Sequence, residues 1–172
     1  MVSHGGARES SAAAALRGAP GYPRGMAARP EPETVVFPAA VAGALARALR
    51  AAAPREFVGL LGGRRDGASW RVAAFVALPD GSAGADAFTV AAADFAAAEA
   101  QLRGRGHAFL GFAHSHPDGP PTPSQRDVAG WWPHCLQTIV GPGGHGAELR
   151  CYLRDGAVVR EVAVHAPGAS LA

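Results

Sequence analysis

The chain has 172 residues and a formal net charge of +2 at pH 7, with 48% hydrophobic and 17% charged residues. This balance is typical of a folded globular protein and excludes one that is mostly disordered. Arg64-Arg65 is the only adjacent basic pair, so no basic cluster indicates nucleic-acid binding. No apolar run is long enough to cross a membrane. We therefore expect a cytoplasmic protein with neither a nucleic-acid nor a membrane partner.

The composition also divides the chain. Residues 1–33 are rich in Gly, Ala, Pro, Ser and Arg, show no sustained period and are predicted to form a disordered tail. Residues 34–166 are predicted to form one domain, and 167–172 a short C-terminal tail. Cys135 and Cys151 are too few for a disulfide framework or a CxxC metal site, so we expect free thiols in the core.

Hydrophobic periodicity and turn residues predict an alternation of strands and helices. In chain order, the predicted elements are a strand at 34–37, a helix at 38–52, strands at 57–61, 70–78 and 87–90, a helix at 91–103, a strand at 108–113, a short helix at 124–131, and strands at 136–140, 148–154 and 157–164. Gly62-Gly63 is predicted to stop the second strand, 79–81 to form a turn, 141–144 a flexible turn, and Asp155-Gly156 a hairpin turn. The pattern favours an α/β or α+β sheet domain.

One segment concentrates residues with metal chemistry: His114-Ser-His116-Pro-Asp-Gly-Pro-Pro-Thr-Pro-Ser124-Gln-Arg-Asp127. Histidines at i and i+2 at a strand end point to the same side, so both rings can reach one ion. A catalytic zinc ion takes three protein ligands and leaves a position for water. Asp127 can be the third ligand if the proline-rich loop, which loses little backbone entropy on folding, returns the following helix to the strand.

Hydrolysis of a peptide bond at such a site also needs a residue that accepts a proton and passes it to the leaving amine, since zinc itself only lowers the pKa of bound water to about 7. The chain has no HExxH motif, so this residue must lie elsewhere. Glu56 is the best candidate. It directly precedes the buried strand 57–61, which would place it over the metal if that strand lies beside 108–113.

Each of these features alone has a simpler structural explanation. A single HxH pair is common without a metal, Ser124 and Asp127 match a helix capping box, and Glu56 would be a solvated acid after a helix end. Their joint occurrence, in order, favours the metal site. The histidine pair with Asp118 also mimics the HxHxD motif of metallo-β-lactamase-like hydrolases, but Gly119 stands where that motif needs a histidine.

Glu56 with the Gly-Leu-Leu-Gly that follows, then His-Ser-His-Pro and Pro-Ser-x-x-Asp, resembles the JAMM (MPN-plus) zinc metalloproteases. The interval of 13 residues between His114 and Asp127 is the spacing of that family. The resemblance covers nearly the whole ordered chain and implies a single α/β MPN-type domain, a mixed sheet flanked by helices. It implies Zn²⁺ on His114, His116 and Asp127, with Glu56 as general base and acid. Ser124 would donate a hydrogen bond to the tetrahedral oxyanion.

The Trp131-Trp132-Pro133 that follows the metal aspartate is similar to the short bacterial branch of this family, although Val58 stands where a cysteine is common. Members of that branch cleave adducts from ubiquitin-like sulfur carriers. The resemblance therefore implies hydrolysis of the bond after the C-terminal Gly-Gly of a small sulfur-carrier protein, with release of cysteine or a similar adduct. The two tryptophans are expected either in the core or beside the substrate groove.

The sequence leaves two alternatives open. One is a deconjugase that removes ubiquitin-like modifiers from proteins, and the other is a non-catalytic MPN scaffold that binds partners in an assembly. Degenerate scaffolds usually lose metal ligands, whereas the full set of five site residues is present here. The complete set favours catalysis.

Overall fold

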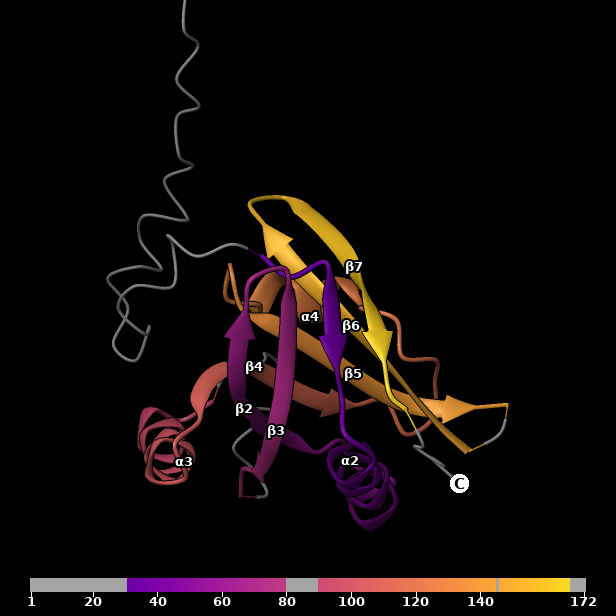
Figure 1. Ribbon diagram of the computed structural model, residues 1–172. Helices are drawn as coiled ribbons and strands as arrows, with labels where there is room; N and C mark the ends of the chain where they lie inside the picture. Colours follow the sequence, from indigo (N-terminus) through magenta and orange to yellow (C-terminus); the bar gives the residue numbers. More distant parts are fainter. Residues whose placement is uncertain (1–30, 80–89, 145, 168–172) are drawn as a thin grey trace, which may run out of the picture.

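The computed structural model describes residues 31–79, 90–144 and 146–167. Its elements are β1 (Thr34–Val36), α2 (Ala39–Ala52), β2 (Val58–Asp66), β3 (Ser69–Ala77), α3 (Ala92–Gly104), β4 (Ala108–Ser115), α4 (Gln125–Gly130), β5 (Leu136–Gly143), β6 (Gly146–Asp155) and β7 (Val158–His165). The strands lie in the order β1-β3-β2-β4-β5-β6-β7, and β1 also pairs with β7. The mixed α/β sheet predicted from the sequence is confirmed, and it closes into a barrel (Figure 1).

The interior of the barrel holds the largest core cluster, which takes side chains from all seven strands and from α2. Val41, Leu45 and Leu49 repeat at helical spacing, which gives α2 one apolar face, and all three are buried in this cluster. Figure 1 shows α2 at one end of the strands. The helix therefore covers that end of the barrel and anchors the chain just before Glu56.

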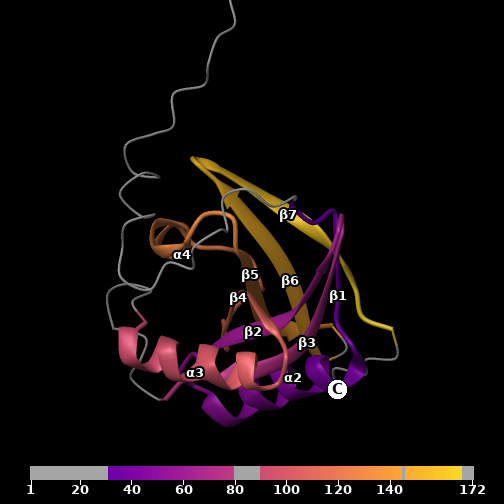
Figure 2. The ribbon, with the colours of Figure 1, turned by 60° about the vertical axis from the view of Figure 1, so that its left-hand side comes forward.

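A second core cluster lies between α3 and the face of β2, β3 and β4 that α3 covers (Figure 2). The prediction that Gly62-Gly63 stops the strand is wrong, because β2 continues to Asp66 with a register shift at these glycines. A Cβ on Gly62 would lie 2.5 Å from Leu102 Cδ2, and one on Gly63 would lie 2.1 Å from the Arg71 carbonyl oxygen. The glycines let α3 and β3 approach closely instead of ending the strand.

A third, smaller cluster packs α4 against β5 and β6 and includes Trp131. Trp131 is buried and stacks on Tyr152 with ring centroids 6.0 Å apart. Trp132 packs on the α3 side, where the centroid of its ring lies 5.2 Å from the ring centroid of Phe112 and 5.3 Å from that of Phe95. Both tryptophans therefore pack in or against the core, which was one of the two positions expected for them.

Four further expectations differ from the structure or lie wholly or partly outside it. The predicted turn at 141–144 is wrong for its first three residues, because β5 runs to Gly143 and pairs with β6. The predicted strand at 87–90 lies outside the described residues except for Val90, which is not in a strand, and the turn at 79–81 is described only at Pro79. The expected tail lies outside the description up to residue 30. Glu31, which is described, contacts His134 and Arg160.

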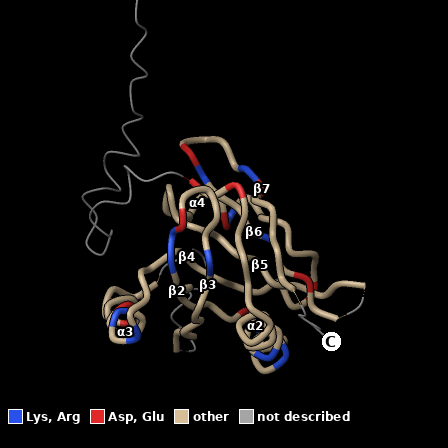
Figure 3. The backbone as a smooth tube through the Cα atoms, viewed as in Figure 1, with Lys and Arg blue, Asp and Glu red and all other residues tan. Residues whose placement is uncertain are grey.

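The described helices include none with the length and apolar character needed to span a membrane. Basic positions are spread over α2, α3, the β2–β3 pair and the β6–β7 hairpin, with acidic positions among them (Figure 3). Cys135 and Cys151 are free and fully buried, which confirms the expectation of core thiols. The hairpin expected at Asp155-Gly156 is also confirmed, since Asp155 pairs with Val158 and Gly156 has a φ of 57°.

Candidate metal centre

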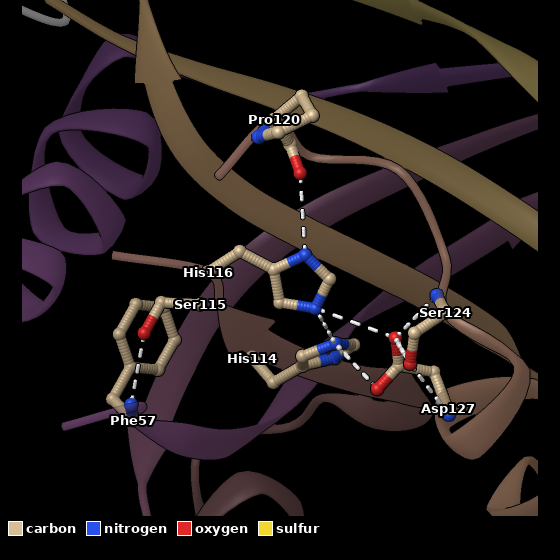
Figure 4. Close-up of polar contacts among 7 residues, drawn as sticks. All are labelled: Phe57, His114, Ser115, His116, Pro120, Ser124 and Asp127. Atoms are coloured by element: carbon tan, nitrogen blue, oxygen red, sulfur yellow. Dashed lines mark hydrogen bonds and ion pairs between the residues drawn. The ribbon is translucent and has the colours of Figure 1, made fainter. Parts of the chain in front are cut away.

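The two histidines stand at the end of β4, which runs on past the predicted Ala113 to Ser115. The His114 side chain is fully buried, whereas that of His116, the residue after the strand, is 16% exposed. Their Nε2 atoms lie 3.2 Å apart. In Figure 4 both imidazole rings point towards the Asp127 carboxylate, as expected for residues two apart on one strand.

Asp127 reaches the histidines because the proline-rich loop carries the chain back to this strand end. Ser124 is the N-cap of α4, and a capping box joins it to Asp127: the Ser124 Oγ accepts from the Asp127 N–H at 3.1 Å, and the Ser124 N–H donates to Asp127 Oδ2 at 2.7 Å. The capping box fixes the carboxylate relative to the helix start. The capping role and the position facing the histidines therefore occur together.

The three side chains fit a single tetrahedral ion. His114 Nε2 lies 3.4 Å from Asp127 Oδ1, and His116 Nε2 lies 3.3 Å from Asp127 Oδ2. The two ring nitrogens lie 3.2 Å apart, and each faces a different oxygen of the carboxylate. Ligands about 2.0 Å from a tetrahedral zinc ion lie about 3.3 Å from one another. Among the described residues, these three form the group of side chains placed to hold a metal.

Hydrogen bonds within this group set its charges. Burial raises the pKa of Asp127, but hydrogen bonds from His114, His116 and Ser124 outweigh burial and hold that pKa well below its usual value. The hydrogen bond to Asp127 raises the pKa of His116 above 6.5, with further contributions from the Pro120 carbonyl and from the charges of Asp127 and Glu56. Without a metal, the carboxylate is thus ionised and attracts positive charge to the point where the rings meet.

The ring orientation of His116 is fixed from the loop. His116 Nδ1 lies 3.2 Å from the Pro120 carbonyl oxygen, a contact that Figure 4 draws at the top of the site. A carbonyl can only accept, so Nδ1 donates to Pro120, and Nε2 would offer its lone pair to a metal once it gives up the proton of its hydrogen bond to Asp127. A second partner of this kind is what orients metal-binding histidines in proteins.

Glu56 reaches the same place through the register of β2 and β4. Val58 pairs with His114 in the antiparallel ladder, so residue 56 falls opposite residue 116. The link is reinforced at Ser115, whose Oγ accepts from the Phe57 N–H at 2.9 Å and whose N–H donates to the Phe57 carbonyl at 3.1 Å. The expectation that strand 57–61 lies beside 108–113 is confirmed.

The histidine–aspartate group opens into a pocket of about 630 Å³. Pro54 and Glu56 line it together with Ser124, Arg126, Asp127 and most of the loop from Pro117 to Pro123. The Ser124 hydroxyl donates to Asp127 Oδ2 at 2.7 Å. Because one hydroxyl has one proton, Ser124 would have to release Asp127 to donate to anything bound in the pocket.

Sequence reasoning missed two residues that hold this site together. Ser115 lies between the histidines, and its side chain faces β2 and positions the chain at Glu56. Gly141 supports the loop: a Cβ there would lie 2.6 Å from the Gly119 carbonyl oxygen and 3.3 Å from that of His116. A serine at the middle of HxH could have been suspected, but no sequence pattern pairs residue 141 with residue 119.

The fold has clear relatives among solved structures. A protein from Desulfitobacterium hafniense matches with a TM-score of 0.68 and 25% identity, over 77% of this chain and 92% of that one. A protein from Salinibacter ruber matches with a TM-score of 0.55 and 23% identity, over 78% and 93%. A JAB1/MPN domain protein from Archaeoglobus fulgidus matches at 21% identity over 76% and 97%, with a TM-score of 0.47. No curated protein matches the chain.

The sequence itself assigns the family. Residues 38–154, more than half of the chain, match the family model Prok-JAB, described as prokaryotic homologs of the JAB domain. The match contains both histidines, Asp127, Glu56 and Ser124. The family-level resemblance to JAMM/MPN proteins is therefore confirmed, and this chain belongs to the prokaryotic homologs of the JAB domain.

Proposed function

We propose that this protein is a zinc-dependent peptidase that hydrolyses the bond after the C-terminal Gly-Gly of a small ubiquitin-like sulfur-carrier protein, releasing cysteine or a similar adduct. The observation that carries the peptidase proposal is the convergence of His114, His116 and Asp127 on one point, at a pocket that Glu56 also lines. Family membership supports the same chemistry. The substrate rests on the resemblance to the short bacterial branch.

The donor set suits zinc rather than a harder cation. Two imidazole nitrogens and one carboxylate are a common ligand set of catalytic zinc sites, whereas magnesium and calcium prefer oxygen ligands alone. Zinc bound here would supply Lewis-acid polarisation of the scissile carbonyl and lower the pKa of a bound water to about 7. The remaining chemistry falls to the side chains of the chain.

Glu56 would accept a proton from the attacking water and deliver it to the leaving amine. Glu56 lines the same pocket as two of the candidate ligands, His116 and Asp127, which supports this role. Ser124 would stabilise the oxyanion by turning its hydroxyl away from Asp127 Oδ2, to which it donates in the absence of substrate. His116 would keep its orientation through the Pro120 carbonyl throughout.

The pocket suits the end of a polypeptide. It is open to solvent, and its lining includes Pro54 and three prolines of the loop, Pro117, Pro120 and Pro123. A Gly-Gly segment has no side chains to clash with these walls, so it could lie extended across the candidate ligands. This is compatible with a tail that a folded carrier presents from outside.

The test is to incubate the protein with a sulfur carrier from its own genome, extended past Gly-Gly by one cysteine, and to follow the intact mass of the carrier. We expect the loss of one residue's mass, stopped by a zinc chelator and restored by added zinc. A carrier that ends at Gly-Gly is the control and should not change. Unchanged extended carrier, incubated with zinc-loaded protein, would refute the proposed substrate.

The two alternatives predict other results. A deconjugase would leave the extended carrier intact but release a ubiquitin-like protein from a lysine side chain. A non-catalytic scaffold would cleave neither, and purified protein would hold no zinc. The complete set of candidate ligands and the adjacent Glu56 favour a peptidase over the scaffold.

A further inference from the structure

The loop between His116 and Ser124 is held from β6, a strand that carries none of the candidate ligands. The Tyr152 hydroxyl, buried at the centre of β6, donates to the Pro121 carbonyl oxygen at 3.0 Å. Pro121 directly follows Pro120, whose carbonyl orients the His116 ring. Because each proline ring restricts its own φ, neighbouring prolines move little relative to each other. The fixed Pro121 carbonyl therefore constrains the Pro120 carbonyl as well.

The same tyrosine contacts the helix that carries Asp127. Its ring stacks on Trp131, the C-cap residue of α4, with an interplanar angle of 28°. Two positions along β6, on the same face of the strand, Arg154 Nη1 donates to the Val128 and Trp131 carbonyls at 2.7 and 3.1 Å. Side chains from one face of β6 thus hold both the loop that orients His116 and the helix that presents Asp127.

We propose that Tyr152 is a positioning residue of the metal centre: its hydroxyl, through the Pro121 and Pro120 carbonyls, holds His116 in the geometry that binds zinc. The inference rests on the proposed zinc site but not on the proposed substrate. Loss of a partner that orients a metal ligand typically weakens metal binding by about 10- to 100-fold. Since Tyr152 acts through two carbonyls, we expect a loss near the lower end, about tenfold.

Tyr152→Phe removes the hydroxyl and keeps the ring that stacks on Trp131. The matched control is Thr138→Val, which also removes a buried hydroxyl, one that contacts Cys151 Sγ at 3.2 Å instead of the loop. The dissociation constant for zinc is measured by competition with a chromophoric chelator, and the melting temperature of the metal-free protein is recorded for each variant. If the Tyr152 hydroxyl were merely structural, its removal, like that of the Thr138 hydroxyl, would lower the melting temperature and leave zinc affinity unchanged.

A second pair of variants perturbs the same loop from β5, at Gly141. Gly141→Ala places a Cβ where the Gly119 carbonyl oxygen would be 2.6 Å away, so the loop must shift. Gly144→Ala is its control, because a Cβ there meets nothing within 4 Å. We expect weaker zinc binding for Gly141→Ala and an unchanged affinity for Gly144→Ala. This pair also tests the role of the loop without altering β6.

The outcomes separate this inference from the proposed function. Zinc binding weakened about tenfold in Tyr152→Phe, with Thr138→Val like wild type, supports the positioning role. Wild-type affinity in Tyr152→Phe overturns that role and leaves the peptidase proposal untouched. Wild-type protein that binds no zinc overturns both.

Discussion

Ser115 offers the most direct test of how the strand pair positions Glu56. The substitution Ser115→Ala removes the acceptor of the buried Phe57 N–H, a hydrogen bond of 2.9 Å. The reciprocal bond from the Ser115 N–H to the Phe57 carbonyl remains, so the strands stay paired. A buried donor left without a partner costs about 1–3 kcal/mol. At roughly 4 °C per kcal/mol for a domain of this size, the melting temperature should fall by about 4–12 °C.

The same change should separate metal binding from turnover. The histidines on either side keep their own contacts with Asp127, so zinc affinity should stay close to wild type. Glu56, next to the released Phe57 N–H, loses a fixed position, so turnover of the extended carrier should fall. Urea unfolding gives the stability, the chelator assay gives the affinity, and mass spectrometry of the carrier gives the rate.

Ser69→Ala is the matched control, since Ser69 is a half-buried serine at the far end of the β2–β3 pair. It should leave turnover unchanged. The reasoning would be refuted by a Ser115→Ala protein with wild-type stability and wild-type turnover. A loss of zinc from this variant would also contradict it, because the effect would then lie at the ligands and not at Glu56.

The other predictions concern the ligands, the proton shuttle and the thiols. Glu56→Gln should keep zinc and lose turnover, because an amide cannot relay the proton; undiminished activity would remove Glu56 from the mechanism. Asp127→Ala should lose both zinc and turnover, as measured by metal content and carrier cleavage. Since the pKa of His116 is raised, mainly by its hydrogen bond to Asp127, zinc affinity should fall as pH drops through that raised pKa, and the chelator assay across neutral to mildly acidic pH checks this. The stability of the metal-free protein should depend on pH in the opposite direction. The raised pKa of His116 stabilises the fold at low pH, and this contribution is lost as pH rises through that pKa. Burial raises the pKa of the Cys135 and Cys151 thiols to about 12, so both should resist iodoacetamide in the native protein and react after unfolding; rapid labelling of native protein would contradict their burial.

The candidate ligands could be predicted from the sequence because their relations are local. His114 and His116 share a side through the two-residue period of a strand. Ser124 and Asp127 are joined by a capping box that spans a single helical turn. The helices α2 and α3 also carry a local signal, since their apolar side chains recur with the helical period and proline or glycine marks their ends. Each of these features lies within a single helix, strand end or helix start, and the structure has each of them.

Other features, namely the closure of the sheet, the position of Glu56 and the support of the loop, depend on residues far apart in the chain. Only the tertiary structure decided these. Closure of the sheet needs β1 between β3 and β7, and a three-residue strand has no sequence signal for its neighbours. Glu56 falls opposite His116 only because Val58 pairs with His114; a register shifted by one residue would turn its side chain to the other face. Tyr152 and Gly141 fix the loop through contacts across 20 residues or more, where packing and register, and no local pattern, choose the partner. The sequence by itself thus determined which groups are available to bind a metal, and the fold determined what holds them together.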